Sequence, residues 1–427
     1  MSNPIWPKET LGGLFDIGAG KAMSPSARLG ERTYPFLRTA NVFWGEVDLT
    51  KLDTMTFSEG EIETKSLKKG DLLVCEGGDI GRSAIWRGEV EKCGFQNHIH
   101  RLRPKNPNVV PAFFMYYLQA GFTQLGIYEG AGNKTTIPNL SRGRLAVLEV
   151  PKPPKPEQEK IAAMLWKAQR AIQVEEKLTA TARELKQSAM RQLFTCGLRG
   201  EPQKETEIGL VPKSWEVIQL QQHLKLAQYG LSVRGQQSGS YPILRMNCQL
   251  DGQVLFRSLQ FVDLNNKVFE SFRIKDGDLL FNRTNSFELV GRTAIFRSQR
   301  DAVFASYLIR LTLDQTQLHP EFVNFYFNQI CVQADLKRLA SRGVSQSNIS
   351  ASKLKEYLIP KTTLDEQKEI AAILQTIDRK ISVHERKRAA LSDLFQTLLN
   401  QLMTAQIRVD KLDIDTREVA ALNPQPA

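Results

Sequence analysis

The stretch PEQEKIAAML, residues 156–165, returns as DEQKEIAAIL, residues 365–374, with six of its ten letters unchanged. The offset of 209 positions holds without a gap when residues 150–199 are set against residues 359–408. Among the matched residues are isoleucines, leucines and a closing arginine, so the identity is not confined to the ten letters. A match of this length predicts two copies of one structural unit.

The repeat continues into the part of the chain that precedes each stretch. YPFLR at 34–38 matches YPILR at 241–245, and KKGDLL at 68–73 matches KDGDLL at 275–280. This earlier part carries short β-branched and aromatic runs, interrupted by Gly, Asn, Asp or Pro about every ten residues. We therefore expect a mostly β domain with a few helices in each copy.

The later part of each copy is expected to be one long helix. Residues 157–196 and 365–405 contain no glycine or proline, and each opens after a proline or an acidic residue. Apolar residues there follow the 4-3 spacing of a coiled-coil seam. The seam residues are Ile161, Leu165, Ile172 and Leu193 in the first copy, and Ile370, Leu374, Ile377, Ile381, Leu391, Leu398 and Leu402 in the second.

A seam this narrow requires a partner helix, and the other copy supplies one with the same period. Antiparallel pairing would relate the copies by a pseudo-two-fold axis and could bring Glu175 near Arg388, in a polar interruption that also contains Thr179 and His384. The alternative is two independent helices, each lying on its own β domain.

The predicted fold class is α+β, with two mostly β domains joined by two long helices packed as an antiparallel coiled-coil pair in an internal pseudo-two-fold repeat. The predicted boundaries are 1–150 for the first β domain, 151–199 for the first helix, 200–358 for the second β domain, 359–408 for the second helix, and 409–427 for a C-terminal tail that packs back on the first β domain.

Composition restricts the class of protein. The 427 residues are 41% hydrophobic and 24% charged, an ordinary globular balance, with a formal net charge of +11. No run of about 20 apolar residues occurs and the N-terminus lacks signal-peptide order, so we expect a cytoplasmic protein with no membrane partner. The five cysteines lie far apart, and the pair His98 and His100 has no counterpart in the second copy, so no metal site is expected.

Two similar heads on paired helices match the two-fold symmetry of B-DNA, on which such proteins read two half-sites. The order Asn-[Leu/Ile]-Ser, Pro-Lys, Glu-Gln-x-x-Ile-Ala-x-x-Leu and long helix, written twice, resembles the specificity (S) subunit of type I restriction-modification enzymes. GLVPKSWEV at 209–217 is also similar to that family. The resemblance covers nearly the full length.

The resemblance implies that the β domains are target recognition domains, reading an asymmetric bipartite double-stranded DNA target. The helices would set the spacer and dock two methyltransferase (M) subunits, with restriction (R) subunits completing the complex. S-adenosylmethionine, ATP and Mg would then belong to the partner subunits, and this chain would hold no cofactor.

The motifs of catalysis are missing from the sequence. An adenine methyltransferase needs an Asn/Asp-Pro-Pro-aromatic loop, and neither KNPNVV nor LNPQPA contains it. DIGAGKAMS at 16–24 and EGAGNKTT at 129–136 both depart from the phosphate-binding loop pattern. We therefore expect a non-catalytic subunit with no catalytic residues, in a complex whose adenine-N6 methyltransferase and ATP-dependent endonuclease activities lie on partners.

Candidate DNA contacts fall into two groups. Shared arginines are suited to phosphates, which position a protein without specifying sequence, although each could instead pair with a framework aspartate. Residues in loops that differ between copies are suited to base edges. The shared set is Arg38, Arg82, Arg245 and Arg292; the variable set is Lys21, Arg28, Asn133, Lys134, Arg234, Arg283, Asn285, Arg342 and Gln346, to which Glu76 and Asp79 add carboxylates able to accept from cytosine.

Two alternatives remain on the sequence alone. One is a two-headed DNA-binding protein or protein scaffold outside a restriction system, and the other is an enzyme with a nuclease or methyltransferase site of its own.

Overall fold

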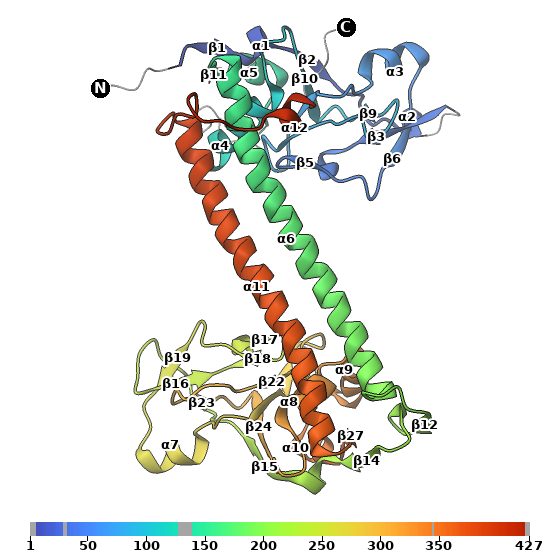
Figure 1. The fold of residues 1–427 in the computed structure, drawn as a ribbon, viewed down its shortest axis with the longest axis vertical. Coiled ribbons are helices and arrows are strands. Elements are labelled where there is room, and N and C mark those ends of the chain that lie inside the picture. The colour runs from blue at the N-terminus through green and yellow to red at the C-terminus, as the bar shows by residue number, and fades with distance from the viewer. Residues whose placement is uncertain (1–5, 29–31, 127–138, 344–345, 423–427) are drawn as a thin grey trace. The chain divides into compact units, whose positions relative to one another are not determined.

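The computed structural model describes residues 6–28, 32–126, 139–343 and 346–422. The chain divides into two compact units, Met1–Glu176 with Arg386–Ala427, and Lys177–Glu385. Helices α6 (Lys155–Cys196) and α11 (Leu364–Met403) each contribute one part to each unit (Figure 1). Every unit therefore consists of a β-rich head, the beginning of one long helix and the end of the other.

The head of the first unit is built on a four-stranded antiparallel sheet in the order β2-β10-β7-β8. Its strands are β1 (Lys8–Thr10), β2 (Phe15–Ala19), β3 (Thr33–Leu37), β4 (Val42–Phe43), β5 (Glu46–Val47), β6 (Asp53–Thr56), β7 (Leu72–Cys75), β8 (Ser83–Ile85), β9 (Gly94–Phe95), β10 (Ile99–Pro104) and β11 (Glu149–Pro151). Its helices are α1 (Leu11–Leu14), α2 (Pro25–Arg28), α3 (Glu59–Lys65), α4 (Pro111–Thr123) and α5 (Arg142–Ala146), with a 3-10 turn at Thr39–Asn41.

The head of the second unit repeats this plan in the longer order β15-β24-β20-β22-β18-β17. Its strands are β12 (Gln203–Thr206), β13 (Gly209–Pro212), β14 (Glu216–Gln219), β15 (Leu224–Tyr229), β16 (Tyr241–Leu244), β17 (Gln249–Leu250), β18 (Gln253–Val254), β19 (Gln260–Val262), β20 (Leu279–Asn282), β21 (Thr284–Asn285), β22 (Thr293–Ile295), β23 (Val303–Phe304), β24 (Leu308–Leu313), β25 (Ser341–Arg342), β26 (Ser347–Asn348) and β27 (Leu358–Lys361). Its helices are α7 (Asn266–Phe272), α8 (Pro320–Phe327), α9 (Ile330–Leu339) and α10 (Ala351–Glu356), with 3-10 turns at Leu220–His223 and Met246–Cys248.

Strand register makes the two heads comparable residue by residue. His100 of β10 pairs with Ala19 of β2, and Ile309 of β24 pairs with Tyr229 of β15. His100 and Ile309 are 209 positions apart, so Ala19 and Tyr229 occupy one structural position in the two copies.

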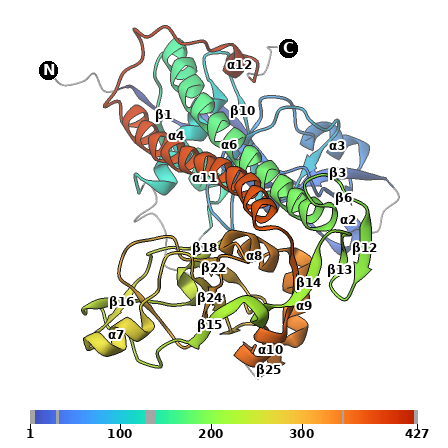
Figure 2. The same ribbon diagram turned by 60° about the horizontal axis from the view of Figure 1, so that its bottom comes forward.

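Helices α6 and α11 run antiparallel within each unit, as predicted. In the first unit Ile161 and Leu165 of α6 share a core with Phe395 and Leu402 of α11. In the second unit, where α8 lies beside α11 (Figure 2), Lys186 Nζ of α6 is 2.6 Å from Asp378 Oδ1 of α11. The same cores contain head residues, so the helices pack on the heads as well as on each other.

The segment after α11 packs on the first unit. Val409 and Val419 are fully buried in the core that contains Ile161, and Val419 lies in the short helix α12 (Arg417–Ala420). Lys160 Nζ donates to the backbone oxygen of Asp410 at 2.7 Å, and Trp166 Nε1 donates to Glu418 Oε2 at 2.9 Å. The first unit therefore includes residues from both ends of the sequence.

Candidate functional site

Corresponding side chains of opposite charge lie where the central strands β7 and β20 end. Glu76 follows β7, and its backbone N–H donates to the oxygen of His98 at 2.9 Å. Arg283 follows β20, and its backbone N–H donates to the oxygen of Tyr307 at 3.0 Å. Glu76 and Arg283 therefore share one backbone position, as do His98 and Tyr307.

A glycine turn borders this position in both heads. A Cβ at Gly20 would lie 2.1 Å from a backbone oxygen, and one at Gly230 would lie 2.3 Å from a backbone oxygen, so both positions require glycine. The next residues are Lys21 and Leu231. They form matching parallel β-bridges, Lys21 to Gln96 and Leu231 to Ala305. The structural counterpart of Lys21 is therefore Leu231.

In the second head, Arg283 lies on an aromatic ring. Its guanidinium carbon is 4.5 Å from the centroid of Tyr229, and its Nη1 donates to the backbone oxygen of Ser306 at 3.3 Å. The ring is fixed in turn, because the hydroxyl of Tyr229 accepts from the backbone N–H of Ala351 at 2.9 Å. Tyr229 and Tyr307 are both 42% exposed, which leaves polar and aromatic surface together at the end of β20.

In the first head the same place is acidic. Glu76 Oε2 lies 3.6 Å from His98 Nδ1, and the Glu76 side chain is 16% exposed against 53% for His98. The residue equivalent to Tyr229 is Ala19, which has no ring. The two heads therefore offer an acceptor and a donor at one point of a common backbone.

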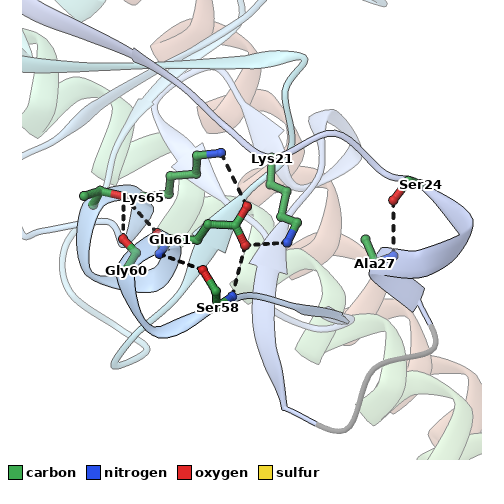
Figure 3. Close-up of polar contacts among 8 residues, drawn as sticks. Lys21, Ser24, Ala27, Ser58, Gly60, Glu61 and Lys65 are labelled. Carbon is green, nitrogen blue, oxygen red and sulfur yellow. Dashed lines mark hydrogen bonds and ion pairs between the residues drawn. The ribbon is translucent and has the colours of Figure 1, made fainter.

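Lys21 is engaged in an intramolecular ion pair. Its Nζ lies 2.6 Å from Glu61 Oε2 (Figure 3). The same Nζ lies 5.3 Å from the centroid of the Phe57 ring. Glu61 also accepts from the N–H of Ser58, its partner in the capping box of α3, and lies 4.0 Å from Lys65. The Lys21 ammonium holds the pKa of Glu61 below its usual value, so a DNA contact by Lys21 would cost this pair.

Two of the shared arginines pair with aspartates of the first head. Arg38 Nη1 lies 2.8 Å from Asp53 Oδ2, with both side chains partly exposed. Arg82 Nη1 lies 3.3 Å from Asp79 Oδ2, and Arg82 Nη2 donates to the backbone oxygen of Thr39 at 3.1 Å. In the structure these two arginines therefore pair with aspartates, which is the alternative to phosphate contact named above.

The remaining described candidates belong to the second head. Arg245 Nη2 donates to the backbone oxygen of Ser258 at 3.1 Å, and Asn285 Oδ1 accepts from the N–H of Ser286 at 2.8 Å. Arg234, Arg292 and Gln346 are exposed. Asn133 and Lys134 lie outside the described residues, and Arg28 and Arg342 belong to α2 and β25 with side chains outside the described part.

The predicted seam residues differ in burial. Ile161, Leu165, Ile370, Leu374, Ile377, Ile381 and Leu402 are buried in the two large cores, whereas Ile172, Leu193 and Leu398 pack against these cores partly exposed. Leu391 is half-buried and belongs to neither core. Near its end each helix instead buries Met190 and Phe194, or Leu399 and Met403, which are the same two repeat positions.

The sequence comparison did not identify the role of the repeated Glu-Gln letters. Gln158 is fully buried; its Oε1 accepts from the N–H of Val110 at 2.9 Å, and its Nε2 donates to the oxygens of Asn108 and Pro153 at 3.2 and 2.8 Å. Gln367 makes the same three kinds of bond in the second unit. Each glutamine therefore fastens the beginning of a long helix to its head.

The glutamates of the same motif each accept a hydrogen bond from a tryptophan side chain of the head. Trp6 Nε1 donates to Glu157 Oε2 at 3.2 Å, and Trp215 Nε1 donates to Glu366 Oε2 at 3.1 Å. Arg408, beyond the end of α11, also donates to Glu157 through Nε and Nη2 at 2.5 and 2.9 Å. The signal that could have identified these residues was their identity in both copies at the expected start of a helix.

Neither a metal cluster nor a membrane span is found in the described parts of the chain. In those parts, no group of three or more His, Cys, Asp or Glu side chains is placed to hold a metal ion. His100 Nε2 instead lies 2.8 Å from the backbone oxygen of Leu140. None of the described helices is long and apolar enough to cross a bilayer.

Comparison with known proteins assigns a family to this two-headed arrangement. The family model for the type I restriction modification DNA specificity domain matches twice, at residues 5–183 and 212–393. The type I restriction enzyme EcoKI specificity subunit of Escherichia coli is 23% identical over 91% of this chain and 86% of its own length. The MjaVIII specificity subunit of Methanocaldococcus jannaschii is 24% identical over 80% of each chain.

A putative MjaX specificity subunit from the same archaeon is 29% identical, but the match spans 47% of this chain and 48% of that protein. Among solved structures, the type I restriction-modification S subunit from M. genitalium has a similar fold, with a TM-score of 0.61 and 17% identity over 94% of this chain and 97% of that chain. With both heads matched by the family model, the chain belongs to the type I restriction-modification DNA specificity family.

Proposed function

We propose that this chain is the DNA-binding specificity subunit of a type I restriction-modification complex. It recognises an asymmetric bipartite target, with one half-site read by each head. The observation that supports this most directly is the pair of heads with one backbone plan and different chemistry at corresponding positions, Glu76 against Arg283. Two equal heads would favour a palindrome, whereas two unlike heads favour unrelated half-sites.

The partners in this proposal are double-stranded DNA, two methyltransferase subunits and restriction subunits. The chain carries no catalytic group of its own, so S-adenosylmethionine, ATP and Mg²⁺ are bound by those partners, in the cytoplasm. A purified chain supplied with Mg²⁺ or a methyl donor is expected to neither cut nor methylate DNA.

The test is to co-express the full-length chain with candidate methyltransferase subunits and to sequence the host genome for modified adenines. We expect one motif of two parts, separated by a gap of fixed length and unrelated in sequence. A single continuous motif would contradict the two-headed proposal, and no modification with any partner would contradict the restriction-modification role.

A scaffold without a DNA role makes a different prediction. Neutralising several phosphates releases counterions, so duplex binding by a specificity subunit should weaken steeply as salt rises. A scaffold would show no such binding at any salt concentration. Titrating duplex DNA at two or more ionic strengths separates the two proposals.

The helices are the proposed ruler of the target. Adding one heptad to both α6 and α11 lengthens each by roughly 10 Å at 1.5 Å per residue. We expect the gap between half-sites to change while both half-sites stay the same. An unchanged gap would refute the ruler.

A further inference from the structure

At the end of the central strand the two heads share their backbone bonds but present side chains of opposite charge. Besides the backbone bonds to His98 and Tyr307, each of the two residues accepts one more backbone bond. The backbone oxygen of Glu76 accepts from the N–H of Leu140, and that of Arg283 accepts from the N–H of Ile349, each at 2.9 Å. The strand end, the glycine turn and the following segment therefore meet in the same way in both heads. What changes is the side chain presented there.

Arg283 has the features of a prepositioned donor. Within the described residues its guanidinium is within ion-pair distance of no carboxylate, and its Nη1 donates to the backbone oxygen of Ser306. The ring of Tyr229 supports one face of the guanidinium, at 4.5 Å. By contrast Arg273, on the same head, lies 2.8 Å from Asp301 and 3.7 Å from Glu270. Arg273 therefore has its charge satisfied internally, and Arg283 keeps donors for a ligand.

Glu76 is the matching acceptor. Its side chain is 16% exposed, and its neighbour within ion-pair distance is His98, which is itself half exposed. A carboxylate is an acceptor only, so it matches a base that presents an amino group and repels one that presents two acceptors. Guanine presents N7 and O6 acceptors in the major groove, and cytosine presents its N4 amino group.

We propose that Arg283 and Glu76 are specificity-determining residues at one equivalent point of the two half-sites. Arg283 reads a guanine through its O6 and N7 atoms, and Glu76 reads a cytosine through its N4 amino group. Tyr229 is a positioning residue, which holds the guanidinium plane through its ring and its own bond to Ala351. This inference rests on the proposed function, because it assigns residues to the two half-sites.

The first test replaces Arg283 by lysine in the methylation-competent complex. Lysine keeps the charge but loses the planar fork that contacts two acceptors at once. A good bidentate pair discriminates by a factor of about 10 to 100, so we expect the preference for guanine at one position to fall by about that much. Competition between duplexes differing at that base pair measures the loss, and the other half-site should stay unchanged.

The matched control is Arg273→Lys, an arginine of the same head whose partners are carboxylates. It should leave every position of the target unaltered. If Arg283→Lys also leaves the target unaltered, or if it weakens binding equally for all sequences, Arg283 contacts phosphate or framework and the inference fails. A chain that does not fold with lysine at 283 would overturn it as well, since Arg283 would then be a framework residue.

The second test is Glu76→Gln. Glutamine offers one donor and one acceptor and matches adenine at N6 and N7, so the preferred base at one position of the first half-site should change from cytosine to adenine. Glu59→Gln is the control, because Glu59 lies on the same head, 76% exposed and paired with Arg32. An unchanged cytosine preference, or no cytosine in that half-site, would overturn the assignment of Glu76.

Failure of the proposed function and failure of the assignment of Arg283 and Glu76 give different results. A wild-type complex that yields no two-part motif would remove the proposed function itself. A wild-type two-part motif that survives both Arg283→Lys and Glu76→Gln unchanged would leave the function standing and remove only the assignment of these two residues.

Discussion

At the scale of single residues, the repeated letters Glu-Gln show why one motif occurs twice. A buried amide is stable only when its oxygen and both hydrogens find partners, and Gln158 and Gln367 each find three. The partners are backbone groups of the loop before α4 or α8 and of the turn before the long helix. The motif therefore specifies a joint between head and helix.

Replacing Gln158 by leucine should loosen this joint in the first unit. The N–H of buried Val110 would be left without a partner, and the backbone oxygens of Pro153 and Asn108 would each lose a hydrogen bond, at a cost of about 2–4 kcal/mol in the free energy of unfolding. Loss of hydrogen-exchange protection at the Val110 amide measures the effect. The control is Gln173→Leu. Gln173 lies on the same helix as Gln158 and makes one exposed side-chain bond to Glu46, so its loss should have little effect.

A second residue-scale prediction concerns Lys21 and Glu61. Replacing Lys21 by methionine removes the main cause of the low pKa of Glu61, so that pKa should rise toward its usual value. A depressed carboxyl pKa adds stability above its unfolded-state pKa and loses it as pH falls through the folded-state pKa. The variant should therefore be less stable than the wild type at neutral pH and equal to it in acid.

The measurement is an NMR titration of the Glu61 carboxyl, with Lys65→Met as control. Lys65 lies farther from Glu61, at 4.0 Å, and its loss should shift the pKa less. Equal shifts in the two variants would show that the 2.6 Å contact of Lys21 is not the main cause.

At the scale of elements, the long helices were predictable and their contact faces only in part. The stretches without glycine or proline identified α6 and α11 to within two residues, because helix breakers are local signals. Met190, Phe194, Leu399 and Met403 were missed because a 3.5-residue seam was extended to the helix ends. There each helix contacts a head as well as its partner, and the buried face is wider.

Contacts between segments that are distant in the sequence also could not be predicted. Nothing local to Arg38 predicts Asp53, and the counterpart of Lys21 became clear only from the bridges that place Leu231. Tyr229 was missed as a support for Arg283 because its equivalent in the first copy is Ala19. The DNA-contact set remains a prediction.

The ion pair between Lys186 and Asp378 fixes the two helices in the second unit. Lys186 is 14% exposed, Asp378 is 26% exposed, and the Lys186 ammonium also lies 5.2 Å from the centroid of Phe325. Replacing Lys186 by methionine leaves a partly buried carboxylate without this partner. We expect the second unit to lose about 1–3 kcal/mol of stability at neutral pH.

The pH dependence gives this prediction its sign. Burial raises the pKa of Asp378 and Lys186 lowers it, so the variant should raise it further. A raised carboxyl pKa favours the folded state at low pH, and that contribution is lost as pH rises through the folded-state pKa. The deficit of the variant should therefore be small in acid and grow toward neutral pH. Lys177→Met, at an exposed position of the same helix, is the control in urea unfolding.

At the scale of the whole molecule, each unit is assembled from segments that the sequence keeps apart. The first unit contains Met1–Glu176 and Arg386–Ala427, joined by the bonds of Arg408 to Glu157 and by the burial of Val409 and Val419. The repeat predicted two heads, but it could not predict that the end of the second helix completes the core of the first head.

Replacing Val419 by aspartate should therefore destabilise the first unit, more than 200 positions away from its N-terminal strand in the sequence. Loss of one buried aliphatic side chain costs about 1.5–3 kcal/mol, and a buried charge adds to this. Hydrogen exchange should quicken in residues 6–14 and 161–166, while residues 212–218 of the second unit stay protected. Leu412→Asp, at a position 48% exposed, is the control.

The division of the chain also determines the order in which its two units can fold during synthesis. Residues of the second unit, Lys177–Glu385, are contiguous, whereas the first unit needs residues after 386. A ribosome releases the chain from its N-terminus, and units fold when their last residues emerge. The head that is translated first must therefore wait for the C-terminus, and the head translated second completes its core first. Chains that terminate early should carry a finished second head and an exposed, aggregation-prone first one.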